Sequence, residues 1–280
     1  MRHLLLVFFT HFLLLGNAQV FSYPHIPDSL VSVESRTKYL ARHYWDCANL
    51  SDTSLFSSPD RVLDYIYLIK QQSSQEIDEN INSLLLQLKN YEDNLSRWLW
   101  WMEHFLHDVQ SPLCDNELYL TICESIITAD IDSSYKIRPQ WQLEWLQRNR
   151  IGHEAENFSF VDNGGSIRQL NDYKGRWTLI LFHRTSCELC HQLICEMKNN
   201  GVIEQLLYEK KLNILAISSS RDDSKVDSWI QGYDNGEIEN SRLYEIQQYP
   251  CMYLLDVNHV VVKRQSLNLQ DIIDILRIVN

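Results

Sequence analysis

The first half of the chain repeats apolar residues at the spacing of α-helices. The capping-box pattern Ser73-x-x-Glu76 is followed by one apolar helix face: Ile77, Ile81, Leu84, Leu85 and Leu88. A second run has the same period: Leu95, Trp98, Leu99, Met102, Phe105 and Leu106. Ser58-Pro59 predicts a helix start with Ser58 as the N-cap and Pro59 as the first helical residue. Further helices are predicted over 116–127 and 140–148. This pattern predicts an all-helical domain over 25–148.

After Ile151 the pattern changes to short apolar runs of strand length. Strands are predicted over 158–161, 167–170, 177–182, 212–218, 252–255 and 260–263. Helices are predicted over 188–198, over 222–230, and from Asn268 onward. Gly201 is predicted to end the first of these helices. The order β-β-β-α-β-α-β-β-α predicts an α/β domain over 149–280, with a mixed central sheet flanked by helices.

The N-terminus has the three parts of a secretory signal peptide. A weakly basic Met1-Arg2-His3 precedes an apolar run from Leu4 to Leu15, and Gly16-Asn17-Ala18 supplies the small residues of a cleavage site. We therefore predict a signal peptide over 1–18 and a mature protein outside the cytoplasm. An uncleaved membrane anchor is the alternative, but the apolar run is short for a membrane span. No later segment has enough consecutive apolar residues to span a membrane, so we expect no membrane insertion after cleavage.

Composition and charge narrow the choice of partners. Hydrophobic residues make up 45% and charged residues 22% of the chain, as in globular proteins. The formal net charge is −12 and no basic stripe is present, which argues against nucleic-acid binding. The seven cysteines are an odd number, so at least one thiol is unpaired within the chain. Cys114 and Cys123 either bridge the Ser111-Pro112 turn or stay as two buried thiols, and the pattern leaves both open.

Aromatic and histidine residues in the helical half offer two weaker candidates. Trp98, Trp100 and Trp101 could bind a ligand, but an aromatic core with one half-exposed ring is favoured. His104 and His107 stand at i and i+3 and could hold a metal. Because no third ligand lies at a supporting spacing, we expect solvated helix residues.

The strongest candidate chemistry lies in Cys187-Glu-Leu-Cys190-His191, which fits both a redox dithiol and a c-type haem attachment site. The cysteines follow a buried strand and open a helix, where partial positive charge stabilises a thiolate. A c-type haem usually sits in a small helical domain, so the dithiol is favoured. Zinc ligation would crowd these residues and Cys195 onto one short helix. A structural disulfide or inert thiols remain open.

Several segments carry a family resemblance. They are Ile151-Gly-His-Glu-Ala-Glu-Asn-Phe158, Leu170-Asn-Asp-Tyr-Lys-Gly175, the C-x-x-C, Tyr244-Glu-Ile246, Tyr249-Pro250 and Met252-Tyr-Leu-Leu-Asp256. Together they resemble extracytoplasmic thioredoxin-like proteins of the peroxiredoxin-like and cytochrome-maturation-type thiol–disulfide oxidoreductases. The helical half, with Arg36-Thr-Lys-Tyr-Leu40 and His43-Tyr-Trp45, resembles a domain of unknown function found ahead of such modules in bacterial envelope proteins.

The resemblance implies roles for particular residues. Cys187 would be the nucleophile, Cys190 the resolving thiol, and Pro250 a cis-proline that exposes the backbone of Tyr249 to substrate. It implies a thioredoxin-like fold, no cofactor and no metal. The expected partners are thiol and disulfide proteins of the cell envelope, met after secretion across the inner membrane into the periplasm.

The sequence also departs from the family pattern. Ser186 replaces an aromatic residue before the first cysteine, Leu193 replaces a frequent glutamate, and no acid lies on the strand over 177–182. These departures keep an alternative open, a non-catalytic thioredoxin-fold binding module of the envelope. A peroxidase is disfavoured because Arg184 stands where such enzymes have threonine. Cys195 and Cys251 could act as third thiols, but small core residues are expected.

Overall fold

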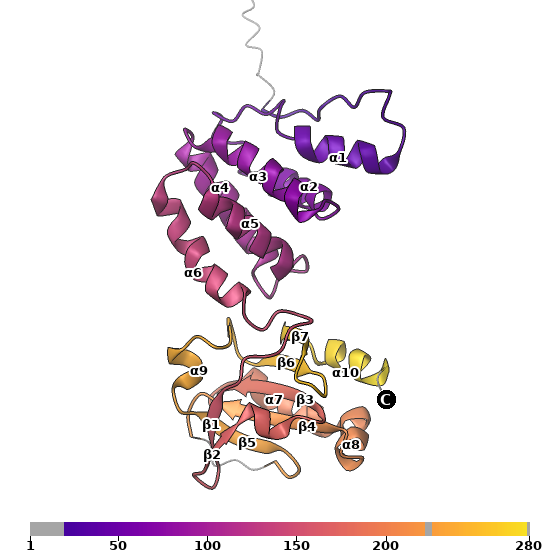
Figure 1. Cartoon of the computed structure of the whole chain (residues 1–280), viewed down its shortest axis with the longest axis vertical. Helices are drawn as coiled ribbons and strands as arrows, with labels where there is room; N and C mark the ends of the chain where they lie inside the picture. Colours follow the sequence, from indigo (N-terminus) through magenta and orange to yellow (C-terminus); the bar gives the residue numbers. More distant parts are fainter. Residues whose placement is uncertain (1–19, 222–225, 279–280) are drawn as a thin grey trace, which may run out of the picture.

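The computed structural model describes residues 20–221 and 226–278, so the expected signal peptide lies outside the described residues. A helical half stands above an α/β half (Figure 1). The helical half contains α1 (Val33–His43), α2 (Asp60–Ile69), α3 (Ser74–Leu88), α4 (Glu92–Leu106), α5 (Asn116–Thr128), the 3₁₀ turn η1 (Ser133–Lys136) and α6 (Ile137–Leu146). No helix among the described residues is long and apolar enough to cross a membrane.

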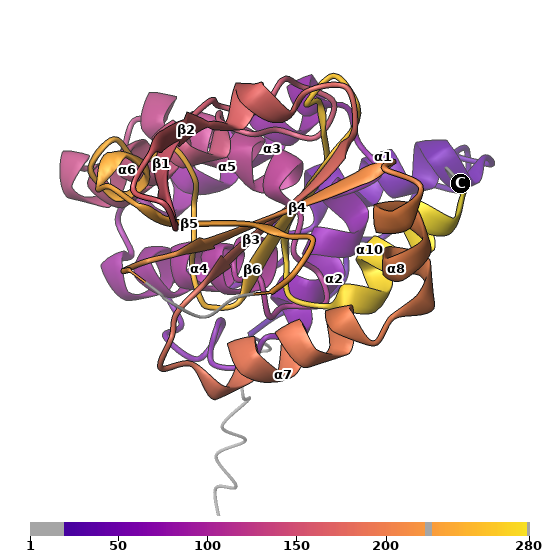
Figure 2. The ribbon, with the colours of Figure 1, turned by 90° about the horizontal axis from the view of Figure 1, so that it is seen from below.

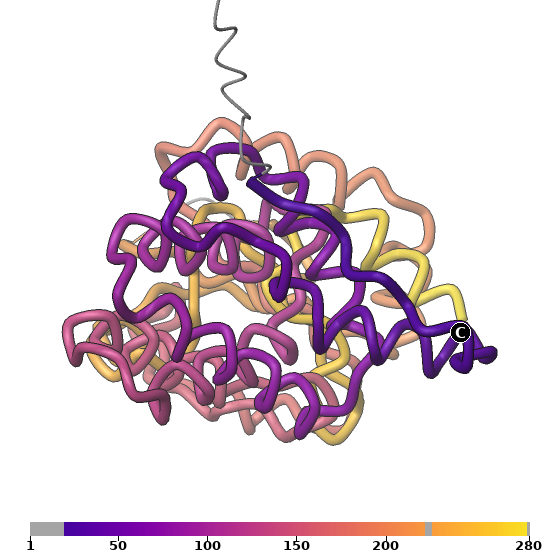
Figure 3. Tube along the Cα trace, turned by 90° about the horizontal axis from the view of Figure 1, so that it is seen from above, coloured from indigo at the N-terminus to yellow at the C-terminus, as the bar shows by residue number. Residues whose placement is uncertain are grey.

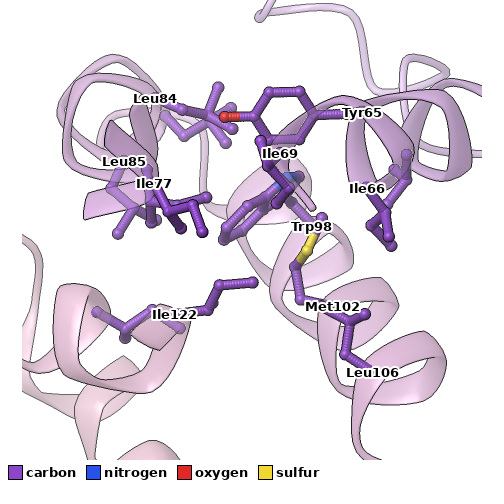
Figure 4. Close-up of a cluster of buried hydrophobic side chains, with 14 of the residues drawn as sticks. Tyr65, Ile66, Ile69, Ile77, Leu84, Leu85, Trp98, Met102, Leu106 and Ile122 are labelled. Carbon is purple, nitrogen blue, oxygen red and sulfur yellow. The ribbon is translucent and has the colours of Figure 1, made fainter. Parts of the chain in front are cut away.

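The helical half packs around the fully buried indole of Trp98, with Ile69, Ile77 and Met102 close to it (Figure 4). The capping box of Ser73 and Glu76 is present, and the predicted apolar face of α3 is buried. The Ser58-Pro59 prediction is off by one residue. Pro59 occupies the N-cap position, α2 begins at Asp60, and no side chain caps this helix.

The aromatic prediction for α4 is confirmed, and the histidine prediction is half wrong. Trp98 is buried and Trp101 partly buried, whereas Trp100 is 55% exposed. His104 is exposed, as expected. His107 is instead buried and paired with Glu245, because the last turn of α4 faces the α/β half rather than solvent.

The α/β half is built on one seven-stranded mixed sheet in the order β2-β1-β5-β4-β3-β6-β7. The strands are β1 (Ser159–Asp162), β2 (Ile167–Gln169), β3 (Trp177–His183), β4 (Leu212–Ser218), β5 (Ile230–Asp234), β6 (Cys251–Leu255) and β7 (Val261–Ser266). β3 pairs in parallel with β4 and antiparallel with β6. The predicted mixed sheet is therefore confirmed, with the strand that precedes the C-x-x-C close to its centre.

Alternation along β3 assigns its side chains to two cores. Leu179 and Leu181 pack with α7 (Glu188–Lys198), α8 (Gly201–Tyr208) and α10 (Leu269–Ile278), which lie on the same side of the sheet (Figure 2). Ile180 and Phe182 point to the other face and pack against Tyr244 and its neighbours. The short elements η2 (Leu170–Tyr173) and α9 (Glu237–Asn240) complete this half. The two faces follow from the two-residue period of a strand.

Two predictions in this half are wrong. Gly201 does not end a helical region but opens α8, because the Asn200 side chain accepts hydrogen bonds from the N–H groups of Val202 and Ile203. The helix expected over 222–230 is not present in its described part, residues 226–230. These residues form a turn and then enter β5, where Ile230 pairs with Leu215. Gly232 lets β5 pass close to the ring of Phe160, where a Cβ would collide.

The two halves meet through directed polar contacts. Arg264 of β7 donates to the carbonyl of Arg148 at 3.2 Å, and Arg148 donates to the carbonyl of Ser241 at 2.9 Å. Asn116 at the start of α5 donates to Gln265 at 3.1 Å. Seen from above, the helical half lies over the α/β half (Figure 3). These contacts join the segment after α6 and the start of α5 to β7 and to the segment after the short helix over 237–240.

Candidate active site

The C-x-x-C lies between the end of β3 and the first turn of α7. Cys187 takes the N-cap position with extended backbone, φ −97° and ψ 111°. Its Sγ accepts a hydrogen bond from the Cys190 N–H at 3.1 Å. The unpaired N–H groups of a helix start carry partial positive charge and stabilise a negative sulfur. This placement matches what the sequence predicts for a redox dithiol.

The two cysteines are joined as a disulfide, with Cα atoms 5.2 Å apart. The structure therefore shows the oxidised form of the pair. Cys187 is partly exposed, whereas Cys190 is fully buried beneath the first turn of α7. Only the Cys187 sulfur is accessible to another molecule, which gives the two sulfurs unequal chemical roles.

The loop before β6 faces this disulfide. The Tyr249–Pro250 peptide bond is cis, as the resemblance implied. The Tyr249 carbonyl oxygen lies 3.8 Å from Cys187 Sγ, although 62 residues separate them. The Arg184 guanidinium stacks over the Tyr249 ring, 4.3 Å from its centroid, and burial raises the pKa of that tyrosine above its usual value. The fold thus brings all four predicted site residues together.

The remaining candidate ligands do not join the site. His191 and Cys195 are exposed on α7. In the described part of the chain, no three His, Cys, Asp or Glu side chains are gathered as a metal site, and Cys187 and Cys190, two of the residues weighed for zinc, are bonded to each other. The core prediction is wrong for Cys195, because it lies on the outward face of α7. It is right for Cys251, whose burial raises the pKa of its thiol to about 12.

The question over Cys114 and Cys123 is also settled. Both are free thiols rather than a disulfide. Cys123 is buried in the helical core, and Cys114 is half-buried near the junction with the α/β half. Burial raises the pKa of the Cys114 thiol to about 11 and that of Cys123 to about 12. Neither thiol is poised for nucleophilic chemistry at neutral pH.

A buried charge cluster supports the loop and was missed by sequence reasoning. Glu245 lies four residues before Tyr249 and is only 4% exposed. Its carboxylate lies 2.9 Å from His107 and 3.6 Å from Arg264, and accepts a 2.9 Å hydrogen bond from Gln265. Burial alone raises the pKa of Glu245, but the hydrogen bond and charge of His107 and the charge of Arg264 outweigh it and lower the pKa. His107 is too distant in sequence for any pattern to indicate this pair.

The two halves of the chain match different protein families. Residues 10–149 match the family described as "Domain of unknown function (DUF5106)", and residues 151–272 match the "AhpC/TSA family". Two similar curated proteins are each named "Thiol-disulfide oxidoreductase ResA", from Bacillus thuringiensis subsp. konkukian and Bacillus cereus. Each is 27% identical over 126 residues, spanning 42% of this chain and 70% of the relative.

A solved structure resembles nearly the whole chain. It is a thioredoxin-like protein from Bacteroides caccae, with a TM-score of 0.78 and 26% identity, and the match covers 94% of this chain and 99% of that one. The resemblance predicted for both halves is therefore confirmed. The chain belongs to the DUF5106 family, and its second half is a thioredoxin-like domain that matches the AhpC/TSA family.

Proposed function

We propose that this protein is a thiol–disulfide oxidoreductase that exchanges disulfides with partner proteins through Cys187 and Cys190. One observation carries the proposal: a bonded C-x-x-C pair has one accessible sulfur, at a helix start, facing the carbonyl before a cis-proline. The family match and the curated relatives named for this activity support it.

The reaction follows from the unequal exposure of the two sulfurs. In the reduced protein, the Cys187 thiolate attacks a partner disulfide, and the partner's S–S bond breaks as a mixed disulfide forms. The leaving sulfur departs as a thiolate and takes up a proton. Cys190 then loses its proton and attacks Cys187, which releases the second partner thiol and closes the Cys187–Cys190 bond. Two electrons pass to the partner, and a partner dithiol returns the protein to its reduced form by the reverse steps.

Tyr249 and Pro250 position the partner in this scheme. The backbone before a cis-proline is open to pairing with an extended chain, and the Tyr249 carbonyl already lies beside Cys187. Arg184 covers one face of the Tyr249 ring. A partner strand that pairs here brings its own sulfur to Cys187, which turns the attack into a positioned, effectively intramolecular step. No cofactor is required by this scheme.

We also propose that the protein works outside the cytoplasm, in the periplasm, on thiol and disulfide proteins of the cell envelope. The apolar run from Leu4 to Leu15 and the small residues after it support a signal peptide over 1–18. We divide the mature chain into a helical domain over 25–148 and a thioredoxin-like domain over 149–280. The division is supported by the helices between Val33 and Leu146 and by separate hydrophobic cores on either side of it.

A second candidate is a non-catalytic thioredoxin-fold binding module. It is favoured by one observation: Leu193, in place of the frequent glutamate, is a buried apolar side chain that supplies no proton acceptor one turn after Cys190. Partners that remain bound to the Cys187→Ser, Cys190→Ser double variant in a pull-down, with no exchange activity in the unaltered chain, would favour it.

The exchange assay uses the mature protein, dithiothreitol as reductant and insulin as the disulfide substrate. Cys187→Ser removes the accessible sulfur and is expected to lower the rate at least about a thousandfold. Cys195→Ser is the matched control, since it removes an exposed thiol from the same helix, and it should keep the full rate. Undiminished activity in Cys187→Ser would contradict the proposal.

A further inference from the structure

A hollow of about 300 Å³ opens beside the proposed dithiol site. Arg184 and Tyr249, which stack on each other next to Cys187, form one end of it. Phe182 and Tyr244 contribute apolar walls, and Trp145 of α6 closes it from the helical half. The helical half therefore supplies part of the surface that a partner meets when it reaches Cys187.

A larger hollow of about 970 Å³ lies between the two halves. Its walls come from α4 and α6 on one side and from the loop over 245–248 on the other. Trp145, Glu245 and Gln247 line both hollows. The two hollows therefore adjoin and form one surface that leads from the dithiol toward α4, which we call the interdomain cleft.

Two exposed tryptophans line the larger hollow of the interdomain cleft. Trp100 is 55% exposed and Trp141 is 41% exposed, high values for the largest apolar side chains. His104 stacks on Trp100 at 5.0 Å, and Arg242 lies over Trp141 at 5.2 Å, so each indole is held on one face. Rigid, half-exposed tryptophans in a hollow are typical anchors for a bound protein chain.

Acidic side chains outnumber arginines along the interdomain cleft. Five carboxylates line it against three arginines: Glu103, Asp108, Asp234, Glu239 and Glu245, with Arg138, Arg184 and Arg242. Glu103 is neutralised by Arg138, and Glu245 by its buried partners. The Asp108 carboxylate is 41% exposed, lies 3.9 Å from His104 and accepts a hydrogen bond from the Gln110 N–H at 2.9 Å. A segment with basic side chains beside aromatic ones suits this lining.

The wall between cleft and dithiol is held in place by the helical half. Gln247 donates to the carbonyl of His107 at 3.0 Å and accepts from the N–H of Val109 at 3.3 Å. Gln110 donates to Gln248 at 2.5 Å. These contacts fix the loop that ends at Tyr249. The place of the Tyr249 carbonyl beside Cys187 therefore depends on contacts from the helical half.

We propose that the interdomain cleft binds the polypeptide substrate of the dithiol, as an extended segment whose cysteine reaches Cys187 and whose aromatic and basic residues lie along α4 and α6. This inference rests on the proposed exchange function and names its substrate class. A polypeptide is favoured over a small molecule because the two adjoining hollows together exceed the range of about 300–1,000 Å³ for small-ligand sites. Their continuity with the dithiol surface also matches a chain that must deliver a sulfur there.

The test compares disulfide probes on the reduced, full-length mature protein. Two synthetic twelve-residue peptides, a length of about 40 Å when extended, carry one cysteine as a mixed disulfide with thionitrobenzoate. One peptide flanks the cysteine with Lys and Trp, and the other with Glu and Ser. The small reagent dithiobis-nitrobenzoate serves as a probe too short to reach the cleft. Release of thionitrobenzoate gives kcat/KM for each probe.

We expect the Lys/Trp peptide to react about tenfold faster than the Glu/Ser peptide at low concentration. The Trp100→Ala, Trp141→Ala double variant should lose that tenfold advantage, because its KM for the Lys/Trp peptide rises. A tenfold loss is the size of effect expected when an aromatic anchor is removed. It should react normally with the small reagent. Tyr67→Ala is the matched control, since Tyr67 is also 55% exposed but lies outside the cleft on α2. Equal rates for the two peptides, or an advantage that survives in the double variant, overturn the inference.

A binding measurement separates this inference from the proposed function. If the unaltered protein releases no thionitrobenzoate from any probe, the exchange function fails. A labelled Lys/Trp peptide with Ser in place of Cys is then titrated with the Cys187→Ser, Cys190→Ser variant. This measurement shows whether the cleft binds a polypeptide without exchange chemistry. Binding that is lost with Trp100→Ala and Trp141→Ala supports a polypeptide site. No binding, or binding of soluble glycan fragments in its place, overturns it.

Discussion

The interiors of the helical half and the α/β half bury apolar side chains, whereas the junction between the two halves buries charged ones. Each half encloses apolar cores of its own, one around Trp98 and two on the faces of β3. The junction buries charge instead, with His107 from one half against Glu245 and Arg264 from the other. Apolar packing tolerates sliding, whereas hydrogen-bonded charges fix register. The junction is therefore built to hold orientation.

That difference bears on the chemistry, because Glu245 and Tyr249 belong to one short loop. The helical half grips this loop through His107 and Gln247, and the loop places the Tyr249 carbonyl beside Cys187. The helical domain supplies no reacting group, yet it can shape the dithiol site through this loop. Substitutions in the cores and at the junction are therefore expected to act in separate ways.

The largest effect is expected in the helical core. Trp98→Ala empties a fully buried site and should lower the free energy of unfolding by about 3–5 kcal/mol. Trp100→Ala, two residues away on the exposed side of α4, should change it by less than about 0.5 kcal/mol. Urea unfolding followed by circular dichroism measures both. Similar values for the two variants would remove the distinction between core and cleft tryptophans.

The junction is tested by Glu245→Ala, which leaves His107 and Arg264 buried without their partner. We expect a loss of about 3 kcal/mol in the free energy of unfolding, the scale of a broken buried ion pair. Asp130→Ala breaks the exposed pair with Lys89 and should leave stability unchanged within error. A Glu245→Ala protein as stable as the parent would mean that charge does not hold the junction.

Acid should weaken the junction selectively. The pKa of Glu245 is lowered in the folded protein, so its stabilising contribution is present above the unfolded pKa of about 4.3 and is lost as pH falls through the folded value. The stability difference between the parent and Glu245→Gln should therefore be constant from pH 7 to about pH 5 and shrink below pH 4. Urea unfolding across this range measures it. A difference that grows in acid would have the opposite sign and reject the assignment.

A smaller effect is expected at the start of α3. Ser73→Ala removes the side chain that accepts from the Glu76 N–H and should cost about 1 kcal/mol of stability. Thermal unfolding detects this loss, while the exchange rate with a small disulfide reagent should stay the same, because α3 lies in the core of the helical half. A change in that rate would show that the helical core and the dithiol are coupled more closely than the junction contacts suggest.

The sequence predicted elements whose stability is local and missed those that depend on distant contacts. The apolar period placed α3 and α4 well, and the strand–Cys–helix pattern located the dithiol. The strand β5 was not predicted, because its conformation comes from pairing with β4 and β1 rather than from its own residues. His107 was misread for the same reason, since its partner Glu245 lies 138 residues further along the chain.

The central claim is that Cys187 and Cys190 form a redox-active pair, and thiol trapping tests it most directly. The mature protein is equilibrated in a series of thiol redox buffers, alkylated, and weighed intact by mass spectrometry. We predict one reversible two-thiol step in the folded protein that disappears in Cys187→Ser, over a constant background from the exposed thiols of Cys47 and Cys195. A pair that stays oxidised until the protein unfolds would contradict the claim and leave the disulfide a structural one.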